Sequence, residues 1–301
     1  GTLLNQKEVK EAELLEVGDH IHFGDHQFFV RSEDAIKTVL TDETVAFDPL
    51  KDPSGSFAYK PQLTKLLHDR TVIPHFQAIV DYTGTQVIGN EILGRIEKNG
   101  LPASPVELFN IASQLGQAVE LSALFREEGI RLGQKLEGNP ALFVNTHPIE
   151  IYQMDTLEKS LRIVREMVPS QPIVLEINET AVTKSEQMKQ LRSLLRDLNL
   201  ELAYDDFGVG QTRLVELAKL PPDYLKFDMS IIRNIHIAPK RLHQIILTFM
   251  KAAEELGIKT LAEGVECREE GDFCKELGFE YAQGYFYGRP LPVSELPHAN
   301  D

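Results

Sequence analysis

The stretch Leu202-Ala203-Tyr204-Asp205-Asp206 is a short apolar run that ends in two adjacent carboxylates. Other strand-like runs in the chain also close on a polar or charged residue, and helix-like stretches separate most of them. These runs are 76–81, 87–91, 141–145, 173–176, 224–228, 261–263 and 279–283. Strands that alternate with helices are typical of a (β/α)8 barrel, in which chemistry sits at the C-terminal ends of the strands.

The first two of these runs are joined only by Tyr82-Thr83-Gly84-Thr85. A pair of parallel strands needs a long crossover, usually a helix, and this link is too short to hold one. We therefore predict an α/β fold, a TIM-like (β/α)8 barrel whose first two strands form an antiparallel hairpin. Outside the barrel, we expect a small N-terminal β segment.

Composition restricts the classes of partner. The chain has 301 residues with a formal net charge of -15, a balance that repels nucleic acid duplexes and anionic membranes. We find no run long enough to span a bilayer and no signal-peptide pattern. Cys267 and Cys274 cannot form a disulfide framework, which fits a reducing compartment. We therefore expect a cytoplasmic protein.

The sequence divides into a β segment over 1–46, a linker over 47–61 and the barrel over 62–301. Within the first part, residues 14–30 alternate and turn like a β-hairpin. Together with Gly1-Thr2-Leu3-Leu4-Asn5, they resemble the C-terminal part of a forkhead-associated (FHA) domain. The phosphothreonine-binding loops of that family would precede Gly1, so the resemblance implies a phosphorylated protein partner bound through the upstream portion.

Asp205 and Asp206 are the most informative acidic pair. Adjacent carboxylates raise each other's pKa unless a cation neutralises them, although an exposed acidic turn would also accommodate such a pair. They are accompanied by other oxygen-bearing side chains at equivalent strand ends, namely Glu91, Asn145, Glu176 and Glu263. Gathered on one rim, these groups would form an oxygen-rich cup suited to two Mg²⁺ or Mn²⁺ ions.

Two basic residues accompany these carboxylates. Lys226 lies inside an apolar run and should point into the barrel, where it must be paired. Its role is either to act among the carboxylates on a water or a developing charge, or to form a structural ion pair with Asp228. Arg95, four residues after Glu91, can reach a phosphate as a bidentate donor, and its alternative is a surface salt bridge.

From about residue 62 to 296 the chain resembles the EAL-domain phosphodiesterases of cyclic di-GMP. The matching motifs are Glu91-Ile92-Leu93-Gly94-Arg95, Val144-Asn145-Thr146-His147-Pro148, Glu176-Ile177-Asn178-Glu179, Asp205-Asp206-Phe207-Gly208-Val209-Gly210, Leu225-Lys226-Phe227-Asp228, Ala262-Glu263-Gly264-Val265-Glu266 and Gln283-Gly284-Tyr285-Phe286-Tyr287-Gly288-Arg289-Pro290. The resemblance implies hydrolysis of cyclic di-GMP to linear pGpG with two divalent cations. It also implies a homodimer.

The resemblance implies a role for each matching residue. The metal ligands would be Glu91, Asn145, Glu176, Asp205, Asp206 and Glu263. The catalytic residues would be Lys226, which positions the attacking water, Glu263 as general base, and Glu91. The dinucleotide would be contacted by Gln77, Leu93, Arg95 and Gln283. Glu179 would stabilise the loop that follows Asp206.

The chain departs from the family pattern mainly around that loop. Asn178 stands in place of Thr, Val209 in place of Thr, and 211–213 in place of Tyr-Ser-Ser, while every inferred metal ligand is kept. Two other readings stay open at this point. One is a catalytically silent receptor of cyclic di-GMP, and the other is a signalling scaffold that works through the FHA-like portion.

Overall fold

The computed structural model describes residues 2–4, 7–8, 20–23, 26–29, 56, 58–82, 86–97, 99–178, 185–208 and 214–296. The chain divides into two compact units, Gly1–Asp52 and Pro53–Asp301, each described by itself. The domain boundaries expected from the sequence stay a prediction.

The first unit contains one antiparallel sheet in the order β2-β1-β3-β4. Its strands are β1 (Thr2–Leu4), β2 (Lys7–Glu8), β3 (His20–Phe23) and β4 (His26–Phe29). β3 and β4 pair in register from His20 opposite Phe29 to Phe23 opposite His26, which matches the hairpin expected within 14–30.

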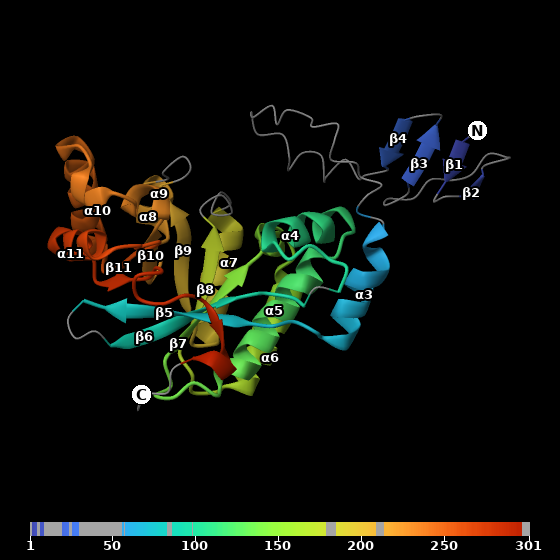
Figure 1. The fold of residues 1–301 in the computed structure, drawn as a ribbon, viewed down its shortest axis with the longest axis horizontal. Helices are drawn as coiled ribbons and strands as arrows, with labels where there is room; N and C mark the ends of the chain where they lie inside the picture. Colours follow the sequence, from blue (N-terminus) through green and yellow to red (C-terminus); the bar gives the residue numbers. More distant parts are fainter. Residues whose placement is uncertain are drawn as a thin grey trace. The chain divides into compact units, whose positions relative to one another are not determined.

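The second unit is built on a closed barrel of β5 to β12 (Figure 1). Its strands are β5 (His75–Asp81), β6 (Val87–Leu93), β7 (Ala141–Thr146), β8 (Ile173–Asn178), β9 (Glu201–Phe207), β10 (Tyr224–Phe227), β11 (Lys259–Ala262) and β12 (Tyr281–Ala282). Neighbours from β6 to β12 are parallel, whereas β5 is antiparallel to both β6 and β12. The predicted barrel with an antiparallel first hairpin is confirmed. An extra strand, β13 (Leu291–Pro292), pairs with β5 and was not predicted.

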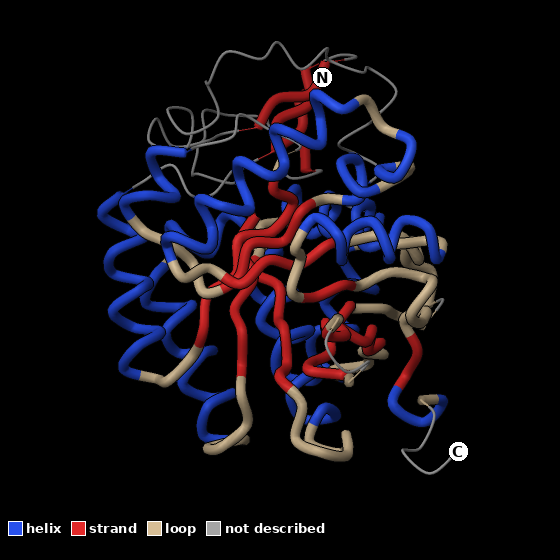
Figure 2. The backbone as a smooth tube through the Cα atoms, turned by 90° about the vertical axis from the view of Figure 1, so that its left-hand side faces the viewer, coloured by secondary structure: helices blue, strands red, loops and turns tan. Residues whose placement is uncertain are grey.

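Helices lie around these strands (Figure 2). The α-helices are α3 (Lys60–Asp69), α4 (Pro105–Gln114), α5 (Ala118–Gly133), α6 (Met154–Met167), α7 (Ser185–Asp197), α8 (Leu214–Lys219), α9 (Met229–Ile232), α10 (Lys240–Leu256) and α11 (Arg268–Leu277). Short 3-10 turns are η1 (Pro148–Tyr152), η3 (Ile235–Ile237) and η4 (Val293–Glu295). Within the described ranges, no helix is both long and apolar enough to span a bilayer.

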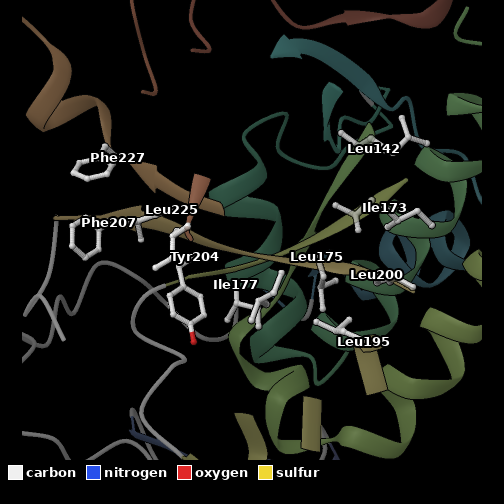
Figure 3. Packing of buried hydrophobic residues seen from close by; sticks show 14 of the residues in the cluster. Leu142, Ile173, Leu175, Ile177, Leu195, Leu200, Tyr204, Phe207, Leu225 and Phe227 are labelled. Carbon is white, nitrogen blue, oxygen red and sulfur yellow. The ribbon is translucent and has the colours of Figure 1, made fainter. Parts of the chain in front are cut away.

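The strands bury apolar side chains on both faces. The outward-facing residues of β7 to β10, such as Leu142, Leu175 and Leu225, pack with the surrounding helices in one core cluster (Figure 3). A second cluster comes from the inward faces, and its fully or nearly fully buried members are Ile79, Ala141, Phe143, Val174, Ala203, Tyr224 and Leu261. Because side chains alternate along a strand, one apolar layer fills the barrel interior below its C-terminal rim.

Candidate active site at the barrel rim

The sequence-predicted polar residues form the next inward-facing layer above this apolar one. Asn145, Glu176, Asp205, Lys226 and Glu263 follow members of the apolar layer by two positions on successive strands, namely Phe143, Val174, Ala203, Tyr224 and Leu261. Gln283 likewise follows Tyr281 by two positions. On the reversed strand β5, Gln77 precedes Ile79 by two, and it lies opposite Glu91 of β6. The two-residue period of the strands therefore directs all these side chains to one rim.

Lys226 stands at the centre of this layer and has no exposed side-chain surface. Its Nζ lies 2.5 Å from Glu176 Oε1, 2.8 Å from Glu263 Oε1 and 2.9 Å from Asp205 Oδ1, with Glu91 Oε2 farther away at 3.6 Å. Burial alone would lower the pKa of Lys226, but the surrounding carboxylates outweigh burial and hold the pKa well above its ordinary value. The lysine is therefore charged across the physiological pH range.

One lysine cannot neutralise this many acids. Glu91, Glu176, Asp205, Asp206 and Glu263 contribute five carboxyl groups around it. Burial, reinforced by Glu91, raises the pKa of Glu176 well above its usual range, and burial does the same for Glu263. Raised pKa values of this kind are expected where buried carboxylates outnumber the positive charges that could neutralise them.

The donor atoms available at this site fit hard divalent cations. The two oxygens of Glu176 and Oδ1 of Asp205 are buried, and the described residues give them no hydrogen-bond donor other than the Lys226 ammonium. This single ammonium is shared between Glu176 and Asp205. Carboxylate oxygens of Asp205, Asp206 and Glu263 also lie within 4.8 Å of one another. Buried carboxylate oxygens that share one ammonium are suitable ligands for Mg²⁺ or Mn²⁺.

Asp205 and Asp206 reach this site together because β9 is irregular at this point. In the pairing of β9 with β10, Tyr204 lies opposite Leu225 and Phe207 opposite Phe227. Two residues of β9, Asp205 and Asp206, therefore face the single residue Lys226, which is the pattern of a β-bulge. Asp206 has φ +57°, in the left-handed region that non-glycine residues seldom occupy.

The Asp206 carboxylate is half-buried and accepts a hydrogen bond of 2.6 Å from Asn178 Nδ2. Burial and the neighbouring charge of Asp205 raise the pKa of Asp206 to about 6, while Lys226 and Asn178 oppose this shift. A cation that bound this group in mildly acidic solution would have to displace a proton.

Amide side chains form a hydrogen-bond network around Glu91. Gln283 Nε2 donates to Glu91 Oε2 at 2.7 Å and to Gln77 Oε1 at 3.0 Å. Asn145 Nδ2 donates to the other Glu91 oxygen at 3.0 Å. These bonds fix both oxygens of Glu91. They leave the side-chain oxygen of Asn145, Oδ1, available as a ligand.

Two hollows meet at the carboxylates. One of about 500 Å³ is lined by Gln77, Gln283, Asp228, Arg233 and Tyr285, and the other, of about 460 Å³, by Arg95, Phe109, Asn145, His147 and Asn178. Glu91, Leu93, Asp205 and Asp206 line both. A ligand with two similar halves could occupy both hollows, with its centre at the carboxylates.

Comparison with known proteins identifies the family. The EAL domain model matches residues 61–290. The chain belongs to the EAL domain family. It is 28% identical over 228 residues to the "Probable cyclic di-GMP phosphodiesterase PdeN" of Escherichia coli K12, covering 73% of this chain and 44% of that protein. It is 29% identical over 229 residues to the "Cyclic di-GMP phosphodiesterase RocR" of Pseudomonas aeruginosa, covering 72% of this chain and 57% of that protein.

Among solved structures, this EAL domain resembles the pH 6 manganese/cy-diGMP complex of Klebsiella pneumoniae BlrP1. The TM-score is 0.65 at 30% identity, over 74% of this chain and 56% of that chain. The chain spans about half the length of the curated relatives it matches. The family match begins at residue 61, so it gives no support to the FHA resemblance of residues 1–46.

The EAL domain brings the sequence-predicted site residues to one rim, apart from Glu179, which lies outside the described residues. Arg95 lines the 460 Å³ hollow and donates from Nη1 to the Gly94 carbonyl at 2.9 Å. The alternative partner for Lys226 is not found, because Asp228 instead caps α9 by accepting the Ser230 N–H at 2.8 Å.

The EAL domain also contains a buried support that sequence reasoning missed. Arg126, with no exposed side-chain surface, forms an ion pair with Glu150 and donates to the backbone carbonyl of Asn145 at 3.0 Å. Glu150 in turn accepts the His147 N–H at 2.8 Å and the Ser122 hydroxyl at 2.6 Å. The sequence signal was an Arg one turn after Ser122 on the mostly apolar buried face of α5, and its acidic partner was not evident. This network anchors the backbone that carries Asn145.

Proposed function

We propose that this EAL domain hydrolyses one phosphodiester bond of cyclic di-GMP, giving linear pGpG, with two Mg²⁺ or Mn²⁺ ions. The observation that carries the proposal is the cluster of five carboxylates around the buried Lys226 at the C-terminal rim. The names of the relatives and the manganese in the BlrP1 complex support the same reaction class.

The proposed ligands divide into two sets that share Asp205. One cation would be held by Glu91, Asn145, Glu176 and Asp205, and the other by Asp205 and Asp206, with Glu263 and Gln283 beside it. When bound, the two cations would acidify the attacking water and offset the charge that develops on the attacking and leaving oxygens. Their binding would also supply the positive charge that the buried carboxylates lack.

Lys226 would position the attacking water, and Glu263 would accept its proton. The Lys226 ammonium lies within 3 Å of three carboxylates, and cations that bind those carboxylates would free one of its N–H groups to donate to the water. Glu263, 2.8 Å from Lys226 Nζ, would be the base that takes the proton the water loses. The water oxygen bonds to phosphorus, the bond from phosphorus to the ribose 3′ oxygen breaks, and a proton returns to that oxygen.

The substrate would be held by residues of both hollows. Arg95 can bind a phosphate oxygen in the 460 Å³ hollow, and Gln77 and Gln283 present amide side chains to the 500 Å³ hollow. Leu93 lines both hollows. The chain carries a net charge of -15, so the anionic substrate depends on the cations and on local basic residues. The roles of Glu179, the homodimer, the phosphorylated partner and the cytoplasmic location stay predictions.

The experiment is hydrolysis of cyclic di-GMP in ¹⁸O-labelled water with Mn²⁺. The products are separated by chromatography, and their masses are measured by mass spectrometry. The proposal predicts pGpG with one ¹⁸O in its terminal phosphate and no product without metal. Nucleotide that binds but is recovered unchanged would contradict the proposal and favour the silent receptor. Matched samples of the Lys226→Met variant show whether any product comes from a contaminating enzyme.

A further inference from the structure

We infer that Asn178 is a positioning residue that holds Asp206 in place for the second cation. The inference rests on the proposed function, because it concerns the same metal site. Asn178 Nδ2 donates to Asp206 Oδ2 at 2.6 Å, and it comes from the neighbouring strand, where Asn178 lies in register with Asp205. The amide therefore reaches past the directly opposite residue to the second carboxylate of the bulge.

Asp206 needs such support because local structure opposes its position. On a regular strand it would point away from Asp205, since successive side chains alternate. The bulge turns it to the same side, with φ +57°. A side chain held in the left-handed region persists only where its surroundings fix it.

Charge opposes the position as well. Asp206 lies beside the Asp205 carboxylate, and Asp228 adds a further acidic group nearby. Before cations bind, both neighbours repel Asp206 from the site, and Lys226 is already paired with other acids. Asn178 offers a donor at hydrogen-bond distance without a positive charge that would repel an incoming cation.

The hydrogen bond sets how the Asp206 carboxylate is presented to the metal. Asn178 donates to Oδ2 and so orients the carboxylate, while each Asp206 oxygen keeps a lone pair that the second cation could use. The Thr that the family pattern has at this position carries its donor one bond closer to the backbone, so it would reach less far toward Asp206. Asn178 is thus a feature of this chain that sets the affinity of one of the two cation sites.

The first test is Mn²⁺ binding to the metal-free protein, with free Mn²⁺ followed by its electron paramagnetic resonance signal. Wild type should bind two ions. Asn178→Ala should raise the dissociation constant of the weaker-bound Mn²⁺ about tenfold. The dissociation constant of the tighter-bound Mn²⁺ should stay within twofold of wild type, because its ligands Glu91, Asn145 and Glu176 are unchanged. Asn178→Thr, which retains a donor, should fall between wild type and Asn178→Ala. The control is Thr248→Ala on the exposed side of α10, which should match wild type.

The second test is the Mn²⁺ dependence of hydrolysis. Asn178→Ala should raise the Mn²⁺ concentration for half-maximal rate about tenfold, while the rate at saturating Mn²⁺ stays within threefold of wild type. A residue of merely structural importance would lower the saturating rate or the melting temperature instead. If wild type binds two ions and Asn178→Ala binds both with unchanged affinity, the inference is wrong. If wild type binds fewer than two ions, the two-metal proposal itself fails.

Discussion

The Nζ atom of Lys226 lies 2.5 Å from Oε1 of Glu176, and neither side chain has any exposed surface. A buried ion pair of this kind is costly to form and more costly to break, because either partner alone would be left as an uncompensated charge. Lys226 also forms ion pairs with Asp205 and Glu263. The stability of the metal-free barrel and the chemistry at its rim therefore depend on the same ammonium group.

Replacing Lys226 by Met should affect both properties. We expect the hydrolysis rate to fall by at least about 100-fold, in the range of a lost group that positions or transfers a proton. Metal-free Lys226→Met should be about 3–5 kcal/mol less stable, because the buried acids lose their shared cation, and added Mn²⁺ should restore part of that loss. Steady-state kinetics and denaturant unfolding with and without Mn²⁺ measure both effects.

The matched control is Lys259→Met at the start of β11. Lys259 pairs with Glu201 at 3.0 Å, but it is partly exposed and lies at the opposite end of the barrel. We expect its rate to stay within about threefold of wild type, because pairs of this exposure contribute little. Equal losses in both variants would show that Lys226 has only a general structural role.

Asp206 predicts a pH-dependent effect on stability. Its pKa is raised to about 6 in the folded protein from an ordinary value of 3.8, so the folded state binds this proton more tightly than the unfolded chain. The resulting stabilisation is fully present below the unfolded value and is lost as the pH rises through the folded value. Asp206→Asn, which is neutral throughout, should therefore melt at a higher temperature than wild type at pH 8 without metal.

At pH 4.5 the same comparison should show a much smaller difference, because wild-type Asp206 is then protonated. Thermal melting of both proteins in a chelator at the two pH values checks the prediction. A difference of equal size at both pH values, or a lower melting temperature for Asp206→Asn at pH 8, would show that the Asp206 charge does not oppose folding.

The sequence predicted the rim of this site because the strand period and the barrel topology act together. Asn145, Glu176 and Lys226 each follow a buried apolar residue by two positions, so an inward apolar side chain predicts an inward polar one. The parallel strands of a barrel bring their C-terminal ends together, so the sequence alone predicts that Asn145, Glu176 and Lys226 lie on one rim.

The same period could not predict the bulge. Alternation places Asp205 and Asp206 on opposite faces, and only the register shift between β9 and β10 brings both to one side. The bond from Asn178 to Asp206 depends on that shift, and so it was equally invisible. The partners of Arg126 come from other elements far along the chain, and no local pattern links residues 126 and 150.

The Arg126–Glu150 pair should be strongly coupled. Arg126→Met leaves the buried Glu150 carboxylate without its cation, and we expect a loss of about 3–5 kcal/mol in unfolding free energy. The double variant Arg126→Met with Glu150→Leu should regain much of this loss, because an apolar pair of similar size avoids the unpaired charge. Urea unfolding of the set measures the coupling, and purely additive losses would show that the two residues act independently.

Asp205 tests the central claim most directly, because it is the one carboxylate assigned to both cations and it lies 2.9 Å from Lys226. The measurement is hydrolysis of cyclic di-GMP by wild type and Asp205→Asn over a Mn²⁺ titration, with a metal-free control. The account predicts metal-dependent pGpG from wild type, and from Asp205→Asn a rate lower by at least about 100-fold that no Mn²⁺ concentration restores. Wild-type turnover without metal, or an Asp205→Asn enzyme that turns over normally, would contradict it.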